Sequence, residues 1–201
     1  MSRSLAVAIT GSIGAGKSAA LESFRRHGAA TVSSDEIVHH LLRTDAEVKR
    51  EILERLGPGV LDEQGEIDRA KVGQVVFRDL ELLAWLESLL HPRVAATYLK
   101  WRDRLAELPD APRITVTEVP LLYEAGGETR FDKVVALTAS PRIRERRGRP
   151  VPEDRSGRQL PDEEKLRRAD FTYVNNGSLE DLDAFVARVM AELQHGDMKK
   201  T

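Results

Sequence analysis

The sequence predicts an α/β fold built on a parallel sheet. Short apolar runs that are typical of buried strands alternate with segments of helical periodicity along most of the 201 residues. A glycine-rich segment, 11–18, joins the first apolar run to the first helical segment. The stretch 34–108 has helical patterns without a clear strand, so we expect a helical insertion there that holds a second substrate.

Each element follows from apolar spacing and from the residues that end helices. Gly28 closes the first helix as a C′ glycine, and Ser33-Ser34-Asp35 offers the start of the next one. Proline at His91-Pro92 predicts an interruption of the longest helix. We expect strands at 5–9, 29–32, 114–118, 132–138 and 171–174. We expect helices at about 34–42, 17–26, 46–56, 69–77, 80–108, 162–169 and 179–193.

Composition excludes several classes of protein. The net charge of −2 gives no general attraction to nucleic acid or to an anionic membrane. The absence of cysteine excludes disulfides and thiolate chemistry, and it fits a reducing cytoplasm. No apolar run is long enough for a signal peptide or a membrane helix. We expect a single cytoplasmic domain over 1–201, a monomer or weak homo-oligomer, with no nucleic-acid or membrane partner.

The segment Gly11 to Ser18 has the spacing G-x-x-x-x-G-K-S of a phosphate-binding loop, and its strand–loop–helix context supports that interpretation. Backbone N–H groups and the helix N-terminus attract phosphate, Lys17 can reach the β- and γ-phosphates, and the Ser18 hydroxyl can bind Mg²⁺. The expected phosphate-binding residues are Ser12, Ile13, Gly14, Ala15, Gly16, Lys17, Ser18 and Ala19.

Two carboxylates are expected at the same edge of the sheet as this loop. Asp35 follows the second strand and Glu118 ends a later one, and the carboxyl ends of parallel strands share one edge. Asp35 is a candidate general base for phosphoryl transfer to an alcohol, and it suits a plain helix N-cap equally well. Glu118 can orient a Mg²⁺-bound water, or it is simply an exposed carboxylate at a strand end.

Seven arginines lie within 142–158, among prolines and glycine. As a lid over a triphosphate, such arginines would stabilise charge in the transition state. A solvated charged face and an RNA-binding arm are the rival interpretations. No aromatic residue interleaves for base stacking, and acidic residues dilute the charge, so we favour a lid over about 140–160 with Arg142, Arg146 and Arg149 as its candidates.

Two other site classes have little support. His39 and His40 are adjacent and point to different sides of a helix, and no H-x-x-x-H pair exists, so the histidines predict no metal site. Two D-x-x-G segments imitate one GTPase element, but the guanine-reading N-K-x-D is absent.

Further motifs give the chain a resemblance to the dephospho-CoA kinase family over nearly its whole length. The V-P-L-L-Y-E run of 119–124 with an upstream H-P pair is more specific than the loop, which many kinases share. The matching segments, in order, are 10–18, 34–38, Gly65 with 67–69, 76–77, 91–92, 119–124, 158–159 with 164–165, 169–170 and 175–177.

The resemblance implies a three-layer P-loop kinase fold that uses ATP and Mg²⁺ to phosphorylate the ribose 3′-hydroxyl of dephospho-CoA. It favours Asp35 as the base and places Asn175 near the adenine. It implies an acceptor pocket lined by Arg69, His91, Leu121, Leu122, Tyr123 and Glu124. Ser33 and Ala19 depart from residues that many members carry. A nucleoside monophosphate kinase and a nucleotide-gated RNA-binding module are the alternatives.

Overall fold

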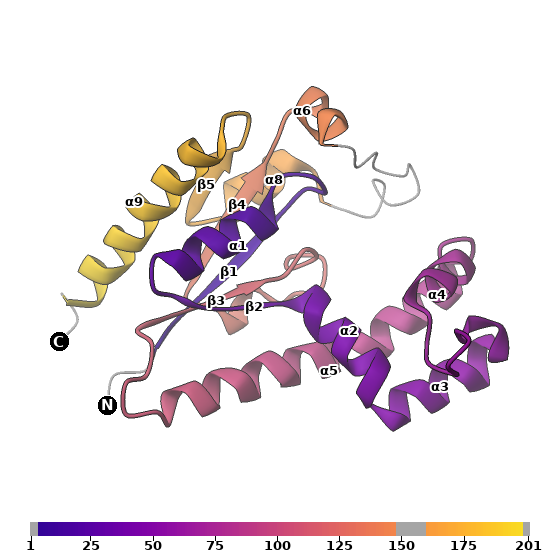
Figure 1. The fold of residues 1–201 in the computed structure, drawn as a ribbon. Helices are drawn as coiled ribbons and strands as arrows, with labels where there is room; N and C mark the ends of the chain where they lie inside the picture. Colours follow the sequence, from indigo (N-terminus) through magenta and orange to yellow (C-terminus); the bar gives the residue numbers. More distant parts are fainter. Residues whose placement is uncertain (1–3, 148–159, 199–201) are drawn as a thin grey trace. The chain divides into compact units, whose positions relative to one another are not determined.

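The computed structural model describes residues 4–147 and 160–198, and the chain divides into two compact units (Figure 1). The first unit comprises residues 1–33 with 101–201, and the second comprises 34–100. Five strands of the first unit form one parallel sheet in the order β2-β3-β1-β4-β5. The strands are β1 (Leu5–Gly11), β2 (Ala30–Ser33), β3 (Ile114–Glu118), β4 (Lys133–Thr138) and β5 (Phe171–Val174). The predicted parallel α/β fold is confirmed.

Strand β1 lies at the centre of the sheet, with β3 and β2 on one side and β4 and β5 on the other. The strand order therefore reverses at β1. It pairs with β3, where Ile9 faces Glu118, and with β4, where Gly11 faces Leu137. Ser33, the last residue of β2, also pairs with Glu118. In open parallel sheets, ligands bind outside the carboxyl ends of strands where the strand order reverses.

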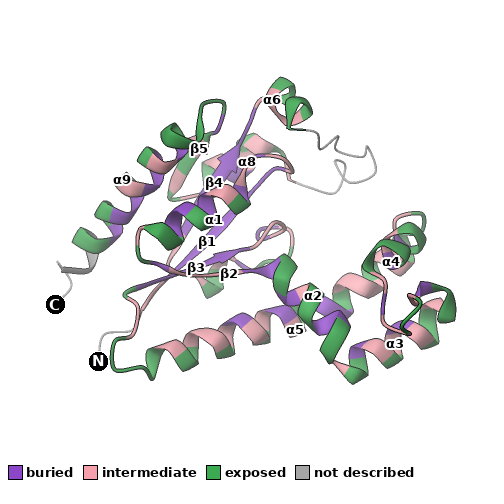
Figure 2. Ribbon diagram, in the orientation of Figure 1, coloured by how far each residue is buried: buried purple, intermediate pink, exposed green. Residues whose placement is uncertain are grey.

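One face of the sheet is covered by α1 (Lys17–Arg26) and α9 (Leu179–Met198), which pack together (Figure 1). Their apolar residues meet alternate residues of the strands, as the period of two in a strand requires. Figure 2 shows the resulting continuous burial along β1 and β4. The largest buried members of this core are Phe24, Ile9, Leu137, Leu182, Val7 and Val116.

Asp183 of α9 joins the two helices through a polar cluster. Its Oδ1 accepts hydrogen bonds from the Ser23 hydroxyl at 2.5 Å and from the Arg26 guanidinium at 2.6 Å, and its Oδ2 lies 3.3 Å from His27 Nε2. The Ser23 hydrogen bond, followed by the Arg26 hydrogen bond, lowers the pKa of Asp183 from 3.8 to about 2. The ionised carboxylate is therefore favoured in the folded protein.

We expect Asp183→Asn to weaken the acid sensitivity of folding. The folded pKa is lower than the unfolded one, so this site stabilises the fold fully above about pH 4 and loses its contribution as the pH falls towards pH 2. Urea midpoints across that interval should fall less in Asp183→Asn than in the wild type, whereas Glu22→Gln, which removes an exposed α1 partner of Arg25, should follow the wild type. An equal fall in Asp183→Asn and wild type would contradict this assignment.

The other face of the sheet carries a smaller apolar cluster. Ala8 and Val134 point to this face, because their neighbours in β1 and β4 point to the first one. Leu122 and Tyr123 from the segment after β3 pack on them. Helix α8 (Asp162–Arg168) packs against β1 and β4.

The second unit is helical and has its own apolar core. Val48, Ile52, Val72, Val76 and Leu89 are among its buried members. Its elements are α2 (Ser34–Thr44), α3 (Ala46–Leu56), η1 (Pro58–Val60), α4 (Arg69–Val76) and the first part of α5 (Leu80–Ala106). Asp45 and Asp68 cap α3 and α4 by accepting backbone N–H bonds, which explains where these helices start.

The expected interruption at His91-Pro92 is wrong, because α5 runs unbroken through Pro92. Leu89 and Leu90, just before the proline, are buried in the core of the second unit. Packing of this kind offsets the hydrogen bond that a proline removes.

Two further observations concern the helices of the structure. Residues Pro141–Arg146 form α6, a short helix inside the arginine-rich segment that was expected only as a lid. Across residues 4–147 and 160–198, no helix combines the length and apolar character needed to cross a membrane.

Candidate functional site

The predicted phosphate-binding loop lies between the end of β1 and the start of α1. The Ser12 N–H donates to the Leu137 carbonyl of β4 at 3.3 Å, and the Ala15 N–H donates to the Ser12 carbonyl at 3.2 Å. Lys17 is buried, and its Nζ donates to the carbonyls of Gly11 at 3.1 Å and Ser12 at 2.9 Å. The loop thus encloses a lysine ammonium at the N-terminus of a helix, an arrangement suited to phosphate.

Gly11 and Gly16 are required by close contacts as well as by backbone conformation. Gly11 has φ +137°, and a Cβ there would lie 1.8 Å from the Leu137 carbonyl oxygen. Gly16 has φ +92°, and a Cβ there would lie 2.4 Å from Asn175 Nδ2. The space that a side chain would fill is taken by groups that hold the loop in place.

Asn175, which follows β5, is a structural partner of the loop. Its side-chain Nδ2 donates to the Ala15 carbonyl at 2.8 Å, and its backbone N–H donates to Thr138 at 2.7 Å. Arg147, just after α6, donates to the Gly14 carbonyl and to the Asn175 carbonyl, each at 3.1 Å. Asn175 is buried, so these contacts fix the loop from the β5 side.

Helix α8 touches the same loop. The Ser12 hydroxyl donates to Asp162 Oδ2 at 3.2 Å, and Arg144 Nη1 lies 3.9 Å from that oxygen. Ser12 is buried, so this hydrogen bond is shielded from water at one end. The loop is therefore held by Arg147 just after α6, by Asp162 of α8 and by Asn175 after β5.

Glu118 is a buried carboxylate at the carboxyl edge of the sheet, and Ser33 Oγ donates to its Oε2 at 3.3 Å. Its alternative interpretation as an exposed carboxylate is wrong, because only 5% of its surface is accessible. Ser18 is exposed in the first turn of α1. A hydroxyl and a carboxylate are oxygen donors, which is the donor type that Mg²⁺ prefers, so the residues present fit this ion. Among the described residues, no group of three or more His, Asp or Glu could hold a metal ion by itself.

The second unit carries Asp35 and Arg69 as an ion pair, with Arg69 Nη2 3.2 Å from Asp35 Oδ1. Asp35 lies in the first turn of α2, and Arg69 is the first residue of α4 after the Asp68 cap. Both side chains are more than half exposed, and exposed pairs contribute only about 0–1 kcal/mol to folding. The pair places the Arg69 guanidinium beside the Asp35 carboxylate at the surface. His91, also expected at the acceptor, is exposed on α5.

The segment 119–127 after β3 is a compact turn rather than an open loop. The N–H groups of Ala125 and Gly127 donate back to Leu121 and Leu122. Leu122 is fully buried, so its side chain belongs to the core, whereas Leu121 keeps partial exposure.

Tyr123 is also buried, and burial, as the largest cause, raises the pKa of its hydroxyl to about 12. Its ring packs under the Arg168 guanidinium at 4.2 Å. This tyrosine is therefore neutral at physiological pH. Glu124, the last residue of the predicted acceptor set, is mostly buried and contacts Lys165 and Leu160.

The structure selects arginines that sequence analysis did not single out. Arg142 and Arg146 are exposed on α6, while Arg144 and Arg147 make the contacts to Asp162 and to the loop described above. Arg149 and most of the expected lid lie outside the described residues. No spacing signal distinguished Arg147 from its neighbours, and Asp162 and Lys165 were missed as well. For Lys165, the only signal in the sequence was that residues 164–165 belong to a segment that matches the dephospho-CoA kinase family.

Comparisons with known proteins agree on one family. The family model described as "Dephospho-CoA kinase" matches residues 5–181. Curated dephospho-CoA kinases from Protochlamydia amoebophila and Aquifex aeolicus are 35% and 33% identical to the chain, over 94% and 93% of it and 96% of each relative.

Solved structures share the fold, and one of the two described next carries the family's name. A crystal structure of a Thermus thermophilus protein has a TM-score of 0.74 at 33% identity, covering 96% of this chain and 99% of that one. A dephospho-CoA kinase from Campylobacter jejuni has a TM-score of 0.69 at 28% identity, covering 96% and 98%.

Proposed function

The chain belongs to the dephospho-CoA kinase family, and we propose that it transfers the γ-phosphoryl group of ATP to the ribose 3′-hydroxyl of dephospho-CoA, the last step of coenzyme A synthesis. The observation that carries the donor half is the loop after β1, which surrounds the Lys17 ammonium with backbone groups at a helix N-terminus. We place this reaction in the cytoplasm, in a monomer or weak homo-oligomer, without nucleic acid or membrane.

In the proposed mechanism the loop residues 12–19 bind the phosphates of ATP, and Lys17 exchanges carbonyl contacts for phosphate contacts. Its ammonium carries three donors and contacts the Gly11 and Ser12 carbonyls, and it is proposed to turn from these carbonyls to a β- or γ-phosphate oxygen when ATP binds. Asn175 and Arg147 hold the loop through hydrogen bonds to Ala15 and Gly14. Asn175 is also proposed to lie near the adenine. A preorganised anion site of this kind stabilises charge without rearrangement during the reaction.

Asp35 is proposed as the general base. It orients the acceptor hydroxyl and accepts its proton as the oxygen attacks the γ-phosphorus, and ADP leaves. Arg69, which pairs with Asp35, orients the carboxylate. Residues 34–108, including Arg69 and His91, are proposed to bind the acceptor, and residues 121–124 are proposed to contact it as well. Arginines of the 140–160 segment are proposed to neutralise the negative charge of the transferred phosphoryl group. The candidates are Arg142, Arg146 and Arg149, together with Arg144 and Arg147.

Mg²⁺ is proposed as the metal, and when bound it would neutralise charge on the phosphates. Ser18 would hold it directly, and Glu118 would act through water. The buried position of Glu118 next to the Ser33 hydroxyl supports a fixed orientation for that carboxylate.

We expect Ser18→Ala to raise the Mg²⁺ concentration needed for half-maximal rate by about tenfold or more, because one oxygen donor is lost. Titrating MgCl₂ at constant free ATP measures this requirement. Ser4→Ala, a serine whose hydroxyl binds the Pro112 carbonyl outside the loop, serves as the matched control. An unchanged requirement in Ser18→Ala would remove this residue from the metal site.

A coupled ADP-release assay with Mg-ATP tests the function directly. It compares dephospho-CoA with the common nucleoside monophosphates as acceptors, since a nucleoside monophosphate kinase is the nearest alternative. With Mg-ATP present, we expect turnover with dephospho-CoA and with none of the monophosphates. Turnover with a monophosphate and none with dephospho-CoA would identify a nucleoside monophosphate kinase instead. A parallel gel-shift with RNA at low salt addresses the RNA-binding alternative, for which we expect no shift.

A further inference from the structure

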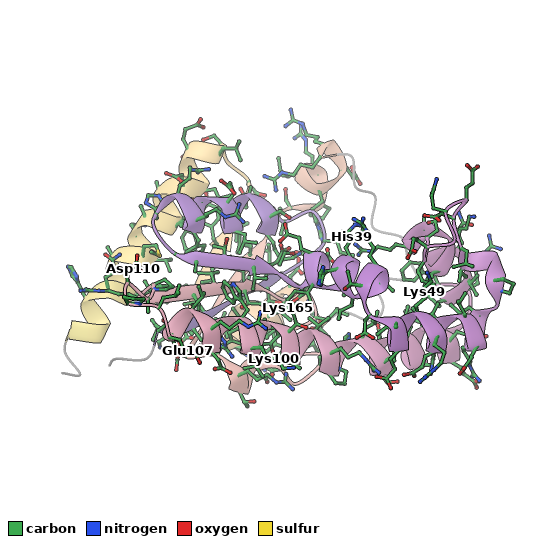
Figure 3. All side chains as sticks on the ribbon, turned by 60° about the horizontal axis from the view of Figure 1, so that its bottom comes forward. His39, Lys49, Lys100, Glu107, Asp110 and Lys165 are labelled. Atoms are coloured by element: carbon green, nitrogen blue, oxygen red, sulfur yellow. The ribbon has the colours of Figure 1, made fainter. Side chains whose placement is uncertain are left out.

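Lys165 on α8 is a charged residue that the mechanism above does not use, although it has no exposed surface. Its Nζ lies 2.9 Å from Glu124 Oε1, and the side-chain exposures of the two partners are 0% and 14%. Figure 3 labels Lys165 among the side chains of the protein. The same Oε1 accepts the Leu160 N–H at 2.9 Å. Glu124 is thereby held by two groups, the Leu160 N–H just before α8 and the Lys165 ammonium inside α8.

A buried ion pair of this kind contributes little net stability. Removing two charges from water costs several kcal/mol per ion, and an apolar pair of similar volume is often as stable or more so. Leu122, two residues before Glu124, and Leu160, whose N–H binds Glu124, belong to the apolar cluster on this face of the sheet. Glu124 Oε2 and Lys165 Nζ are both buried without a hydrogen bond of good geometry among the described residues, so their side chains are joined as an ion pair. The charges are therefore better explained by the geometry that they impose than by stability.

The geometry in question links two parts of the site. Asp162 and Lys165 are three residues apart in α8, which places them on one face of the helix. Asp162 accepts a hydrogen bond from Ser12 of the phosphate loop, and Lys165 binds Glu124 of the 119–127 turn. One turn of α8 thus connects the donor loop with the turn that was assigned to the acceptor.

We propose that Lys165 is a positioning residue that holds the 119–127 turn at a fixed distance from the phosphate loop, through its buried ion pair with Glu124. The inference rests on the proposal that residues 121–124 line the acceptor pocket. Glu124 then acts on the acceptor by orienting this turn, and Leu121, which stays partly exposed, is the side chain of the turn that reaches the substrate.

The variant Lys165→Met tests this role, because a fully buried side chain cannot itself touch a substrate. We expect the KM for dephospho-CoA to rise about tenfold or more while the KM for ATP stays within about twofold, since the Ser12–Asp162 hydrogen bond is retained. Lys133→Met is the matched control. It removes the partly exposed ion pair between Lys133, on β4, and Asp170, and it should leave both KM values unchanged.

A purely structural role would lower the melting temperature and the active fraction without moving the KM for the acceptor. An unchanged acceptor KM in folded Lys165→Met would therefore overturn the inference. Where that variant does not fold, the double variant Glu124→Gln/Lys165→Met decides, because it buries no unpaired charge and keeps an acceptor for Leu160. A raised acceptor KM in the double variant supports the inference, and a wild-type KM contradicts it. Wild-type protein that does not phosphorylate dephospho-CoA would instead disprove the proposed function.

Discussion

Replacing Asp35 by asparagine is expected to lower kcat by about 10²- to 10⁴-fold while ATP still binds, because general-base assistance in proton transfer is of that size. Asparagine keeps the volume and one oxygen of the side chain, so it can still accept a hydrogen bond from Arg69. It cannot accept the proton of the acceptor hydroxyl. The loss should therefore appear in turnover at saturating substrates, and calorimetric titration should give an ATP affinity close to that of the wild type.

Glu36→Gln is the matched control for this experiment. Glu36 neighbours Asp35 in the first turn of α2, is exposed, and carries the same charge. Its neutralisation changes the local potential as much as Asp35→Asn does, so equal losses in both variants would point to an electrostatic effect. Turnover that is unchanged in Asp35→Asn would remove this residue from the mechanism. The alternative role as an N-cap is wrong, because Asp35 is the second residue of α2, so only a favourable charge in the first turn of the helix would remain.

Substituting Gly11 by alanine should strongly destabilise the sheet unit. The added Cβ would lie 1.8 Å from the Leu137 carbonyl oxygen, and the backbone there has φ +137°. Neither β1 nor β4 can move without breaking the pairing of Gly11 with Leu137 at the centre of the sheet. Strain and overpacking together are expected to cost about 3 kcal/mol or more in the free energy of unfolding.

Gly28→Ala separates the two causes of that loss. Gly28 also has a positive φ, +90°, but no atom lies within 4 Å of the Cβ that alanine would add. It should lose only the conformational term, about 1–2 kcal/mol. Urea unfolding followed by circular dichroism compares both variants with the wild type. A loss in Gly11→Ala no larger than that in Gly28→Ala would show that the contact with β4 relaxes.

The elements of the fold were predictable because local signals and tertiary packing agree in most of the chain. The helices at 17–26 and 46–56 were predicted with the bounds that the structure shows, since Gly28, Asp45 and Gly57 mark their ends through their own backbone and side-chain bonds. The break at Pro92 was predicted wrongly because the proline signal is local, whereas the burial of Leu89 and Leu90 that keeps α5 continuous is not.

The site was predictable where one motif contains all its parts, and less so where distant segments meet. The phosphate loop lies within eight consecutive residues, and the structure gives it the strand–loop–helix setting that its spacing predicts. Its supports, Arg147, Asp162 and Asn175, come from segments more than 130 residues away, and no local pattern assigns them to Gly14, Ser12 or Ala15. Resemblance to a family suggested a role for Asn175 near the adenine, but the hydrogen bond to Ala15 could only be found in three dimensions.

The central claim is that the chain phosphorylates the ribose 3′-hydroxyl of dephospho-CoA. The most direct test is to incubate the purified chain with Mg-ATP and dephospho-CoA and to locate the new phosphate by ³¹P–¹H correlation NMR of the isolated product. The account predicts a phosphate coupled to the ribose 3′ proton, with one ADP formed for each product. A phosphate at any other position, or dephospho-CoA recovered unchanged while the enzyme is folded and binds ATP, would contradict it.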